Sequence, residues 1–448
     1  MPEPDASDRT WPPLETAQSA LIGLTALTAA IAPLAIPPMV VILAFVTLVQ
    51  HRHDDWSLFA ATPSMIRNPS ALAVIAFVTL AAASTAWAAQ PGYALKSLVQ
   101  AVLTGLSAWY AANAMSRQLT MLGQARRNRF VRALPIAALF VAIYFLLDFL
   151  TGDGATLFVA RNFPSIFDGF ENTFIYDGNR SLVGLDESYF NRIAAALVLL
   201  TVGLLAAVRF WPRRTWGFAL SVFVSLGMVG ICLRSGSATA LLSLAAAALA
   251  FACALWSPKP ATRMLQAALL VVTLTAVPLS MLPKALNMDK NPALPPSFTE
   301  RVIIWNDIAG MTLERPWLGI GVKSIRFLER WPPKPGSSME ARGGLRSYPH
   351  PHNGYLQVWL ELGAVGAVIF AIAGVSLING ILSLPHDMQK YALALAAGTS
   401  AIIGPGWDIW QPWLVAAIGF SWIALMMLRA EFKRAEKNLP DVRSSMFS

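Results

Sequence analysis

The most informative segment of the chain reads Tyr348-Pro-His-Pro-His-Asn-Gly-Tyr-Leu-Gln-Val-Trp-Leu-Glu-Leu-Gly-Ala-Val-Gly366. Two histidines, His350 and His352, stand just before a long apolar run. A carboxylate inside an apolar helix is costly unless it faces other protein or water. The segment therefore indicates either a helix start with ordinary polar packing or a catalytic histidine above a supporting polar face. On a helix that face would consist of residues four apart: Asn353, Gln357 and Glu361.

The composition is that of a membrane protein. The chain has 448 residues, of which 56% are hydrophobic and only 13% charged. Several apolar runs reach the roughly 20 residues that a helix needs to cross a bilayer. We therefore expect an all-α polytopic membrane protein with about 12 transmembrane helices. The net charge of +9 does not indicate nucleic acid binding, because much of it lies in short loops where it sets topology.

The order of apolar and basic segments predicts the topology. Arg117–Arg132 carries five arginines and no acid, which is typical of a cytoplasmic loop. Prolines at positions 33, 37 and 38 divide the first apolar run into two short helices that form a hairpin. The expected organisation is a cytoplasmic tail over 1–16, helices 1–9 within 17–281, a periplasmic loop over 282–352, helices 10–12 within 353–429, and a cytoplasmic tail over 430–448.

The large periplasmic loop contains a helix signal and a cluster of basic residues. Ile304, Ile308 and Met311 recur at helical spacing within Glu300–Arg315, which predicts an amphipathic helix at the membrane surface. We expect this helix to end in a turn formed by Pro316-Trp-Leu-Gly-Ile-Gly-Val. Arginine suits a diphosphate because its planar fork binds phosphate oxygens in pairs; the alternative is contact with lipid headgroups or local acids. The basic residues are Lys323, Arg326, Arg330, Lys334, Arg342 and Arg346.

His352 is the candidate general base. It lies at the predicted N-terminus of span ten, where the helix dipole disfavours a protonated imidazole. A neutral histidine can take a proton from a sugar hydroxyl; the alternative is a histidine that only caps or packs. His350, held between two prolines, is expected to be structural. A metal site is not expected, because the His-X-His pair lacks a nearby cysteine or a third ligand.

Two motifs resemble the O-antigen ligase and O-antigen polymerase superfamily of bacterial membrane glycosyltransferases. The family has a histidine followed by Asn, Ser or Gln, then nine residues and Gly-X-X-Gly, which here is His352-Asn353 and Gly363-Ala-Val-Gly366. Upstream it has an arginine, a tryptophan four residues later and a Pro-X-X-Gly-X-Gly turn. These correspond to Arg301, Trp305 and Pro316–Gly321. The resemblance is specific over about Glu300–Phe370 and elsewhere rests on hydropathy and topology.

The resemblance implies a cofactor-free, metal-independent enzyme facing the periplasm from the bacterial inner membrane. It would move a glycan from undecaprenyl diphosphate to an acceptor sugar hydroxyl, with inversion at the anomeric carbon. We expect an O-antigen ligase of lipopolysaccharide biosynthesis, whose acceptor is lipid A–core; the alternative is an O-antigen or exopolysaccharide polymerase, whose acceptor is another lipid-linked repeat. His352 would activate the hydroxyl and Arg301 would hold the diphosphate. Supporting roles would fall to Trp305, Asn353, Gln357 and Glu361.

The chain departs from the family at one position. Many members carry a Ser-Arg pair that opens the helix after an outer turn, whereas here Ser237 is followed by Ala238. Arg234, four residues before Ala238, is the expected substitute at the diphosphate.

The alternative from another class is a flippase or transporter of lipid-linked sugars. Transporters usually show internal repeats and charged residues deep in several spans. No repeat is evident here, and Glu361 is the main charge deep in an apolar run. The enzyme is therefore the preferred interpretation.

The topology makes a direct prediction. Gln124, within the arginine-rich segment, should be cytoplasmic, so an engineered Gln124→Cys should resist a membrane-impermeant thiol reagent added from outside. Strong labelling of intact cells at this position would contradict the topology.

Overall fold

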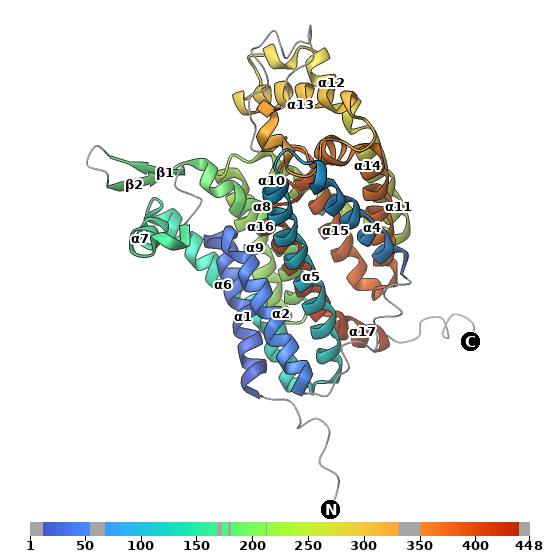
Figure 1. Cartoon of the computed structure of the whole chain (residues 1–448). Helices are drawn as coiled ribbons and strands as arrows, with labels where there is room; N and C mark the ends of the chain where they lie inside the picture. The colour runs from blue at the N-terminus through green and yellow to red at the C-terminus, as the bar shows by residue number, and fades with distance from the viewer. Residues whose placement is uncertain are drawn as a thin grey trace, which may run out of the picture.

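The computed structural model describes residues 12–53, 68–167, 173–177, 181–211, 213–330 and 350–438. Long helices form a bundle, and one antiparallel hairpin of β1 (Phe174–Tyr176) and β2 (Leu182–Leu185) lies beside it with α7 (Figure 1). The α-helices are α1 (Pro12–Ile31), α2 (Ile36–His53), α4 (Pro69–Ser84), α5 (Pro91–Met121), α6 (Gln124–Leu150), α7 (Gly154–Asn162), α8 (Glu187–Val208), α9 (Arg214–Arg234), α10 (Ala238–Trp256), α11 (Pro258–Leu274), α12 (Ala276–Ala285), α13 (Pro296–Glu314), α14 (Gly354–Gly380), α15 (His386–Ile403), α16 (Pro412–Met427) and α17 (Arg429–Lys437).

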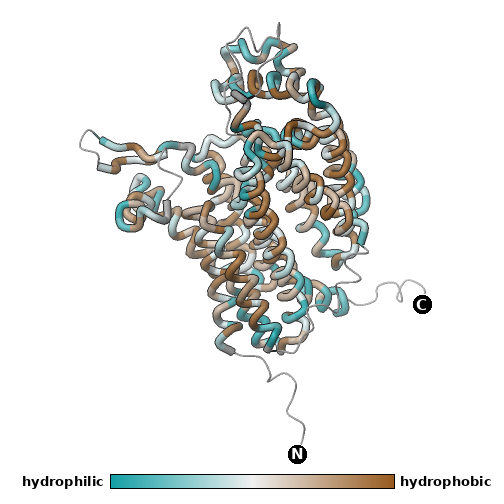
Figure 2. The backbone as a smooth tube through the Cα atoms, in the orientation of Figure 1, coloured by the Kyte–Doolittle hydropathy of each residue, from teal (hydrophilic) through white to brown (hydrophobic). Residues whose placement is uncertain are grey.

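The predicted class, an all-α polytopic membrane protein, is confirmed. Nine helices of the described chain are long and apolar enough to cross a membrane, or ten if the bent pair α11–α12 counts as one span. The predicted fourth and eleventh spans, Tyr93–Ser116 and Tyr391–Ile403, lie within helices α5 and α15, which are not in this group. The count of about 12 spans therefore stays a prediction. Figure 2 shows apolar residues along the long helices and hydrophilic ones concentrated towards the two ends of the bundle.

Helices α8 and α16 form the centre of the bundle. They are the most buried of the candidate spans, and they approach closely at Gly203, where a Cβ would lie 2.8 Å from the Cβ of Ala424. Small residues allow this close packing between membrane helices. On the outside, α9 exposes large apolar side chains such as Phe218 and Leu226. In a membrane protein such side chains face lipid rather than water.

Three details of the predicted organisation change. The hairpin is confirmed, but its helices α1 and α2, with 20 and 18 residues, are not short. The arginine-rich segment is not a loop, because α5 continues to Met121 and α6 begins at Gln124. The predicted ninth span, about Met264–Met281, is bent by 69° between α11 and α12. Pro278 lies just after the bend; it has no N–H to donate, and its ring opposes the carbonyl of Leu274.

The two ends of the bundle differ. Helices α12 and α13 lie at one end and α17 at the other (Figure 1). Arg127, in the arginine-rich segment, is buried and pairs with Glu431 of α17 at 2.8 Å. The arginine-rich segment and the α12–α13 region therefore lie at opposite ends, as the predicted topology requires.

Helix α14 is broken in its middle, and the Pro316–Gly321 turn fills the break. Gly363 has φ 66° and ψ −165°, a conformation almost exclusive to glycine. The break releases the carbonyls of Leu360 and Glu361, which accept from the N–H groups of Ile320 and Gly321, both at 2.9 Å. In return Ala364 N–H donates to Pro316 O at 2.7 Å, and Val365 N–H to Trp317 O at 3.3 Å. The sequence predicts an uninterrupted helix here, and that prediction is wrong.

The break makes Gly363 intolerant of substitution. A Cβ at this position would lie 2.2 Å from the carbonyl carbon of Trp317, and the backbone conformation alone would cost about 1–3 kcal/mol. Gly363→Ala should therefore lower the thermal unfolding midpoint and the abundance of the membrane-inserted protein. Gly380→Ala, on the same helix but with no atom within 4 Å of the added carbon, is the matched control. Equal stability of the two variants would contradict the observed interlock.

Candidate functional site

His352 occupies a strained position at the start of α14. Its φ of 50° lies in the left-handed region, which few non-glycine residues adopt and which often marks functional sites. Asn353 follows as the N-cap, accepting from Leu356 N–H at 3.1 Å. The buried ring of His350 lies beneath His352, with 3.9 Å between ring centroids, and its Nδ1 accepts from the His352 N–H at 3.3 Å. His350 thus supports the backbone that presents His352.

Helix α13 supplies Arg301 and Trp305 from one face. It runs from Pro296 to Glu314, so it begins before the predicted Glu300–Arg315 helix and ends one residue short of it. The predicted apolar face is present, but Ile304, Ile308 and Met311 are buried within the protein rather than lying on the membrane surface. One turn apart, Arg301 and Trp305 reach two different loops of the site. Trp305 Nε1 donates to Pro351 O at 3.1 Å, beside His352, and Arg301 Nη1 donates to Pro405 O at 3.1 Å.

The turn between α15 and α16, residues 404–411, connects these groups. Pro405 O also accepts from the Thr239 hydroxyl, at 3.3 Å. The Trp407 ring lies 6.0 Å from that of His350, and the Arg192 guanidinium carbon is 5.6 Å from the Trp407 ring centroid. Arg192 and His350 therefore both contact Trp407 of this turn. The sequence gives no sign of this contact, because Arg192 stands at the start of an apolar run far from Trp407 along the chain.

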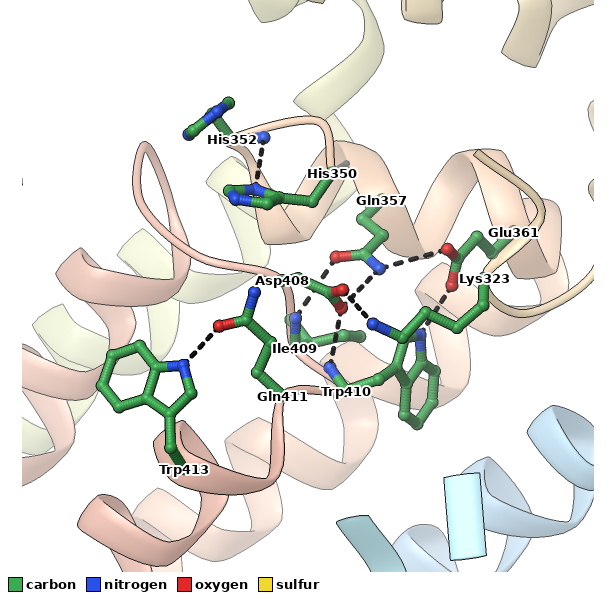
Figure 3. A network of polar contacts seen from close by, with 10 residues as sticks. All are labelled: Lys323, His350, His352, Gln357, Glu361, Asp408, Ile409, Trp410, Gln411 and Trp413. Atoms are coloured by element: carbon green, nitrogen blue, oxygen red, sulfur yellow. Dashed lines mark hydrogen bonds and ion pairs between the residues drawn. The ribbon is translucent and has the colours of Figure 1, made fainter. Parts of the chain in front are cut away.

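A buried polar network anchors this turn (Figure 3). Asp408 pairs with Lys323, and both side chains are buried. Its other oxygen accepts from Gln357 Nε2 and Trp410 N–H, both at 2.9 Å. Glu361, fully buried, accepts from Gln357 Nε2 at 3.1 Å and Trp410 Nε1 at 2.6 Å. These five residues, here named the Lys323–Asp408 network, tie the 404–411 turn to α14.

The electrostatics keep both histidines neutral. Burial, and then the charge of Arg301, lower the pKa of His352 to about 4. Burial is also the main cause that lowers the pKa of His350 to about 3. For Asp408, burial raises the pKa, but the charge and hydrogen bond of Lys323 outweigh it, so the pKa lies below its usual value. Near pH 7 the site therefore holds neutral imidazoles beside cationic arginines.

The structure brings some predicted residues together and separates others. Arg301, Trp305, His352 and Asn353 gather at one place; Asn353 also donates to the Ser280 hydroxyl at 3.3 Å. Gln357 and Glu361 do form the predicted stripe, but both bind the Lys323–Asp408 network rather than the imidazole of His352 in Figure 3.

Arg234 and the described members of the basic cluster make contacts within the protein. Arg234 pairs with Asp153 at 3.0 Å and lies over Phe190, 4.8 Å from its ring centroid. Lys323 is buried and pairs with Asp408, so it does not belong to an exposed basic surface. This contact with a local acid is the alternative to phosphate binding. Arg326 lies over Tyr93 at 5.8 Å. The described part of the chain does not include Lys334, Arg342 and Arg346, nor the side chain of Arg330.

Sequence reasoning missed Asp408 and Trp410. Asp408 stands in a short outer turn, Gly404-Pro-Gly-Trp-Asp, and no spacing connects it to Gln357, 51 residues away. The one available signal was Glu361 itself, since a buried acid requires partners. Among the described residues, no three His, Cys, Asp or Glu side chains are grouped so as to hold a metal ion.

The fold and site therefore define a multi-pass membrane protein with a neutral histidine and arginines at one end of its helix bundle. Residues 223–371 match the family described as O-antigen ligase. This segment contains His352, Arg301 and Arg234. The resemblance to the O-antigen ligase superfamily is confirmed over this part of the chain.

Curated relatives agree with the family match. A protein of Rickettsia conorii, named as a candidate polysaccharide ligase, is 31% identical over 143 residues, which cover 31% of this chain and 33% of the relative. Similarly named proteins are 30% identical over 143 residues in Rickettsia prowazekii, covering 31% of this chain and 34% of the relative, and 28% identical over 149 residues in Rickettsia bellii, covering 32% and 35%. The chain thus matches about a third of the length of these relatives.

The Lys323–Asp408 pair predicts a large and specific stability effect. Lys323→Met would leave a buried carboxylate without its cation, which typically costs about 3–5 kcal/mol, so thermal stability in detergent should fall sharply. The double variant Lys323→Met/Asp408→Leu removes both charges and should recover much of the loss. Lys390→Met, which breaks a more exposed pair with Asp387, should cost only about 0–1 kcal/mol. Similar losses in Lys323→Met and Lys390→Met would show that Lys323 is not a buried partner.

The lowered pKa of His352 predicts the pH at which activity is lost on acidification. Only the neutral imidazole can accept a proton, so kcat/KM should fall with a midpoint near pH 4 rather than near the ordinary value of about 6.5. Arg301→Gln removes a positive charge that disfavours protonation, so the midpoint of the residual activity should move upwards. A wild-type midpoint near 6.5 that Arg301→Gln leaves unchanged would contradict the described environment.

Proposed function

We propose that this protein is a membrane glycosyltransferase that moves a glycan from undecaprenyl diphosphate to an acceptor sugar hydroxyl. The observation that carries the proposal is that His352, kept neutral, and Arg301 lie around one short turn at the same end of the bundle. This pairs a general base with a cation suited to a diphosphate. The match to the O-antigen ligase family supports the same chemistry.

The proposed reaction follows from these positions. His352 takes the proton of the acceptor hydroxyl as its oxygen attacks the anomeric carbon. The bond between that carbon and the diphosphate oxygen breaks, and undecaprenyl diphosphate leaves with the electron pair. Attack from the face opposite the leaving group inverts the anomeric centre. Arg301 stabilises the charge that develops on the leaving diphosphate, the role that a metal ion fills in other transferases.

Lipid A–core is the proposed acceptor, which makes the protein an O-antigen ligase. The printed names of the relatives, which refer to polysaccharide ligases, support this choice over a polymerase. In this proposal the protein lies in the bacterial inner membrane with the α12–α13 end facing the periplasm. A deletion strain should lose polymer-capped lipopolysaccharide and accumulate the lipid-linked polymer. Capping by single repeats only would instead indicate a polymerase.

His352→Ala tests the proposed base. Transfer by the purified, lipid-reconstituted protein should fall about 10²–10⁴-fold, as is typical when a general base is removed. The protein should remain inserted and should still retain the donor, because arginines rather than His352 bind the diphosphate. His386→Ala, at an exposed histidine that begins α15, is the control and should transfer normally. Near-normal transfer by a stably expressed His352→Ala variant would refute the assignment.

Arg301→Lys tests the diphosphate contact. Lysine keeps the charge but loses the paired donor geometry, so donor affinity and transfer should both fall well below wild type. Arg263→Lys, at an exposed arginine on α11, provides the control. Full activity in both Arg301→Lys and Arg301→Ala would reduce Arg301 to a structural contact of Pro405.

A further inference from the structure

A second cavity lies between α8, α9 and α15, at the end of the bundle that carries α17. Its volume is about 450 Å³, and its walls come from the last turns of α8, the first turns of α9 and Tyr391 of α15. Phe432 of α17 packs beside it, with 5.9 Å between the ring centroids of Phe432 and Tyr391. Because α17 and the α12–α13 region lie at opposite ends of the bundle (Figure 1), this cavity is remote from the proposed catalytic site.

Positive charge predominates around this cavity. Arg209, which follows α8, and Arg214, the first residue of α9, both line it, and none of the described lining residues is an acid. Arg214 is exposed and forms no ion pair with a residue that the structure describes. Arg209 pairs with Asp387, which also accepts from Lys390 at 3.2 Å. Asp387 can therefore balance only one of these three positive charges.

Local packing brings the two arginines to the same cavity. Gly217, in the first turn of α9, lies against the end of α8, where an added Cβ would be 3.1 Å from Val208 O. The guanidinium carbon of Arg209 lies 5.8 Å from the ring centroid of Phe432. Two guanidinium groups at one cavity suit a phosphate, because each can donate to a pair of its oxygens.

The α9 wall of the cavity continues into a surface suited to lipid. Phe218 lines the cavity and is 73% exposed. Val222 and Leu226 extend the same exposed apolar face at four-residue spacing along α9. Trp216 is also exposed, and tryptophan is enriched where a membrane meets water. A phosphate in the cavity would therefore lie beside a surface for hydrocarbon chains, which favours a lipid over a soluble phosphate compound.

We propose that this cavity binds the headgroup of an anionic phospholipid such as phosphatidylglycerol. The phosphate lies between Arg209 and Arg214, and the acyl chains follow the exposed face of α9. Basic pockets between membrane helices are typical sites for anionic headgroups. The proposal is independent of the glycan transfer proposed above, because this lipid takes no part in that reaction. A lipid that binds the folded protein alone also stabilises it by mass action.

Lipid binding to the delipidated, detergent-purified full chain tests the site. Native mass spectrometry and the thermal unfolding midpoint report on added phosphatidylglycerol and on phosphatidylethanolamine, whose headgroup has no net charge. The wild type should bind phosphatidylglycerol about tenfold more tightly and should be stabilised by it. Arg209→Gln/Arg214→Gln should lose this preference. Arg129→Gln/Arg132→Gln, which removes two exposed arginines of α6, is the charge-matched control and should keep it.

A single variant and a soluble probe complete the test. Arg214→Gln breaks no described ion pair, so it should fold even if the double variant does not, and it should still weaken phosphatidylglycerol binding. Glycerol 3-phosphate, which carries the phosphate without acyl chains, should not stabilise the protein at the same concentration; equal stabilisation would indicate a soluble anion and overturn the proposal. An unchanged lipid preference in folded Arg214→Gln, or an equal loss in the Arg129→Gln/Arg132→Gln control, would also overturn it.

Discussion

The site depends on the main-chain interlock between the broken helix α14 and the turn before η7 (Ser324–Arg330). Four hydrogen bonds join Pro316–Gly321 to the residues around Gly363. An interruption of a membrane helix is tolerated only where other groups satisfy the released N–H and carbonyl groups, and here the turn does so. The close approach needs glycine on both sides: a Cβ at Gly319 would lie 2.4 Å from Leu360 O. The two glycine motifs of the sequence are thus the two halves of one contact.

The interlock fixes the positions of the charged groups. Lys323 follows the inserted turn directly, with φ 61°, and reaches Asp408 in the 404–411 turn. The 404–411 turn contacts Arg301 through Pro405 and His350 through Trp407. The buried ion pair itself contributes little net stability, since desolvation of the two charges offsets their attraction. Its evident consequence is geometric: it holds the turn between α15 and α16 against the histidines.

The sequence predicted the fold class and several residues that the structure brings together, but not the contacts that hold them in place. Apolar runs placed the helices well, and the spacing of Ile304, Ile308 and Met311 identified the buried face of α13. Gly363 was identified only as part of the Gly-X-X-Gly motif, and the helix break at it was missed, because a glycine within an apolar run gives no signal of a released backbone. Lys323 resembled its basic neighbours, because its partner Asp408 is distant in sequence. Arg192 looked like an ordinary helix start. Each of these failures concerns a contact between distant segments, which local pattern and composition do not encode.

The central claim is that the donor diphosphate binds between Arg301 and His352. A cryo-electron microscopy structure of the protein with a non-hydrolysable undecaprenyl diphosphate–sugar analogue tests it most directly. The account predicts diphosphate oxygens within hydrogen-bonding distance of the Arg301 guanidinium, with the anomeric carbon on the side of His352. A diphosphate bound elsewhere in the bundle, with His352 and Arg301 unchanged and remote from it, would contradict the account.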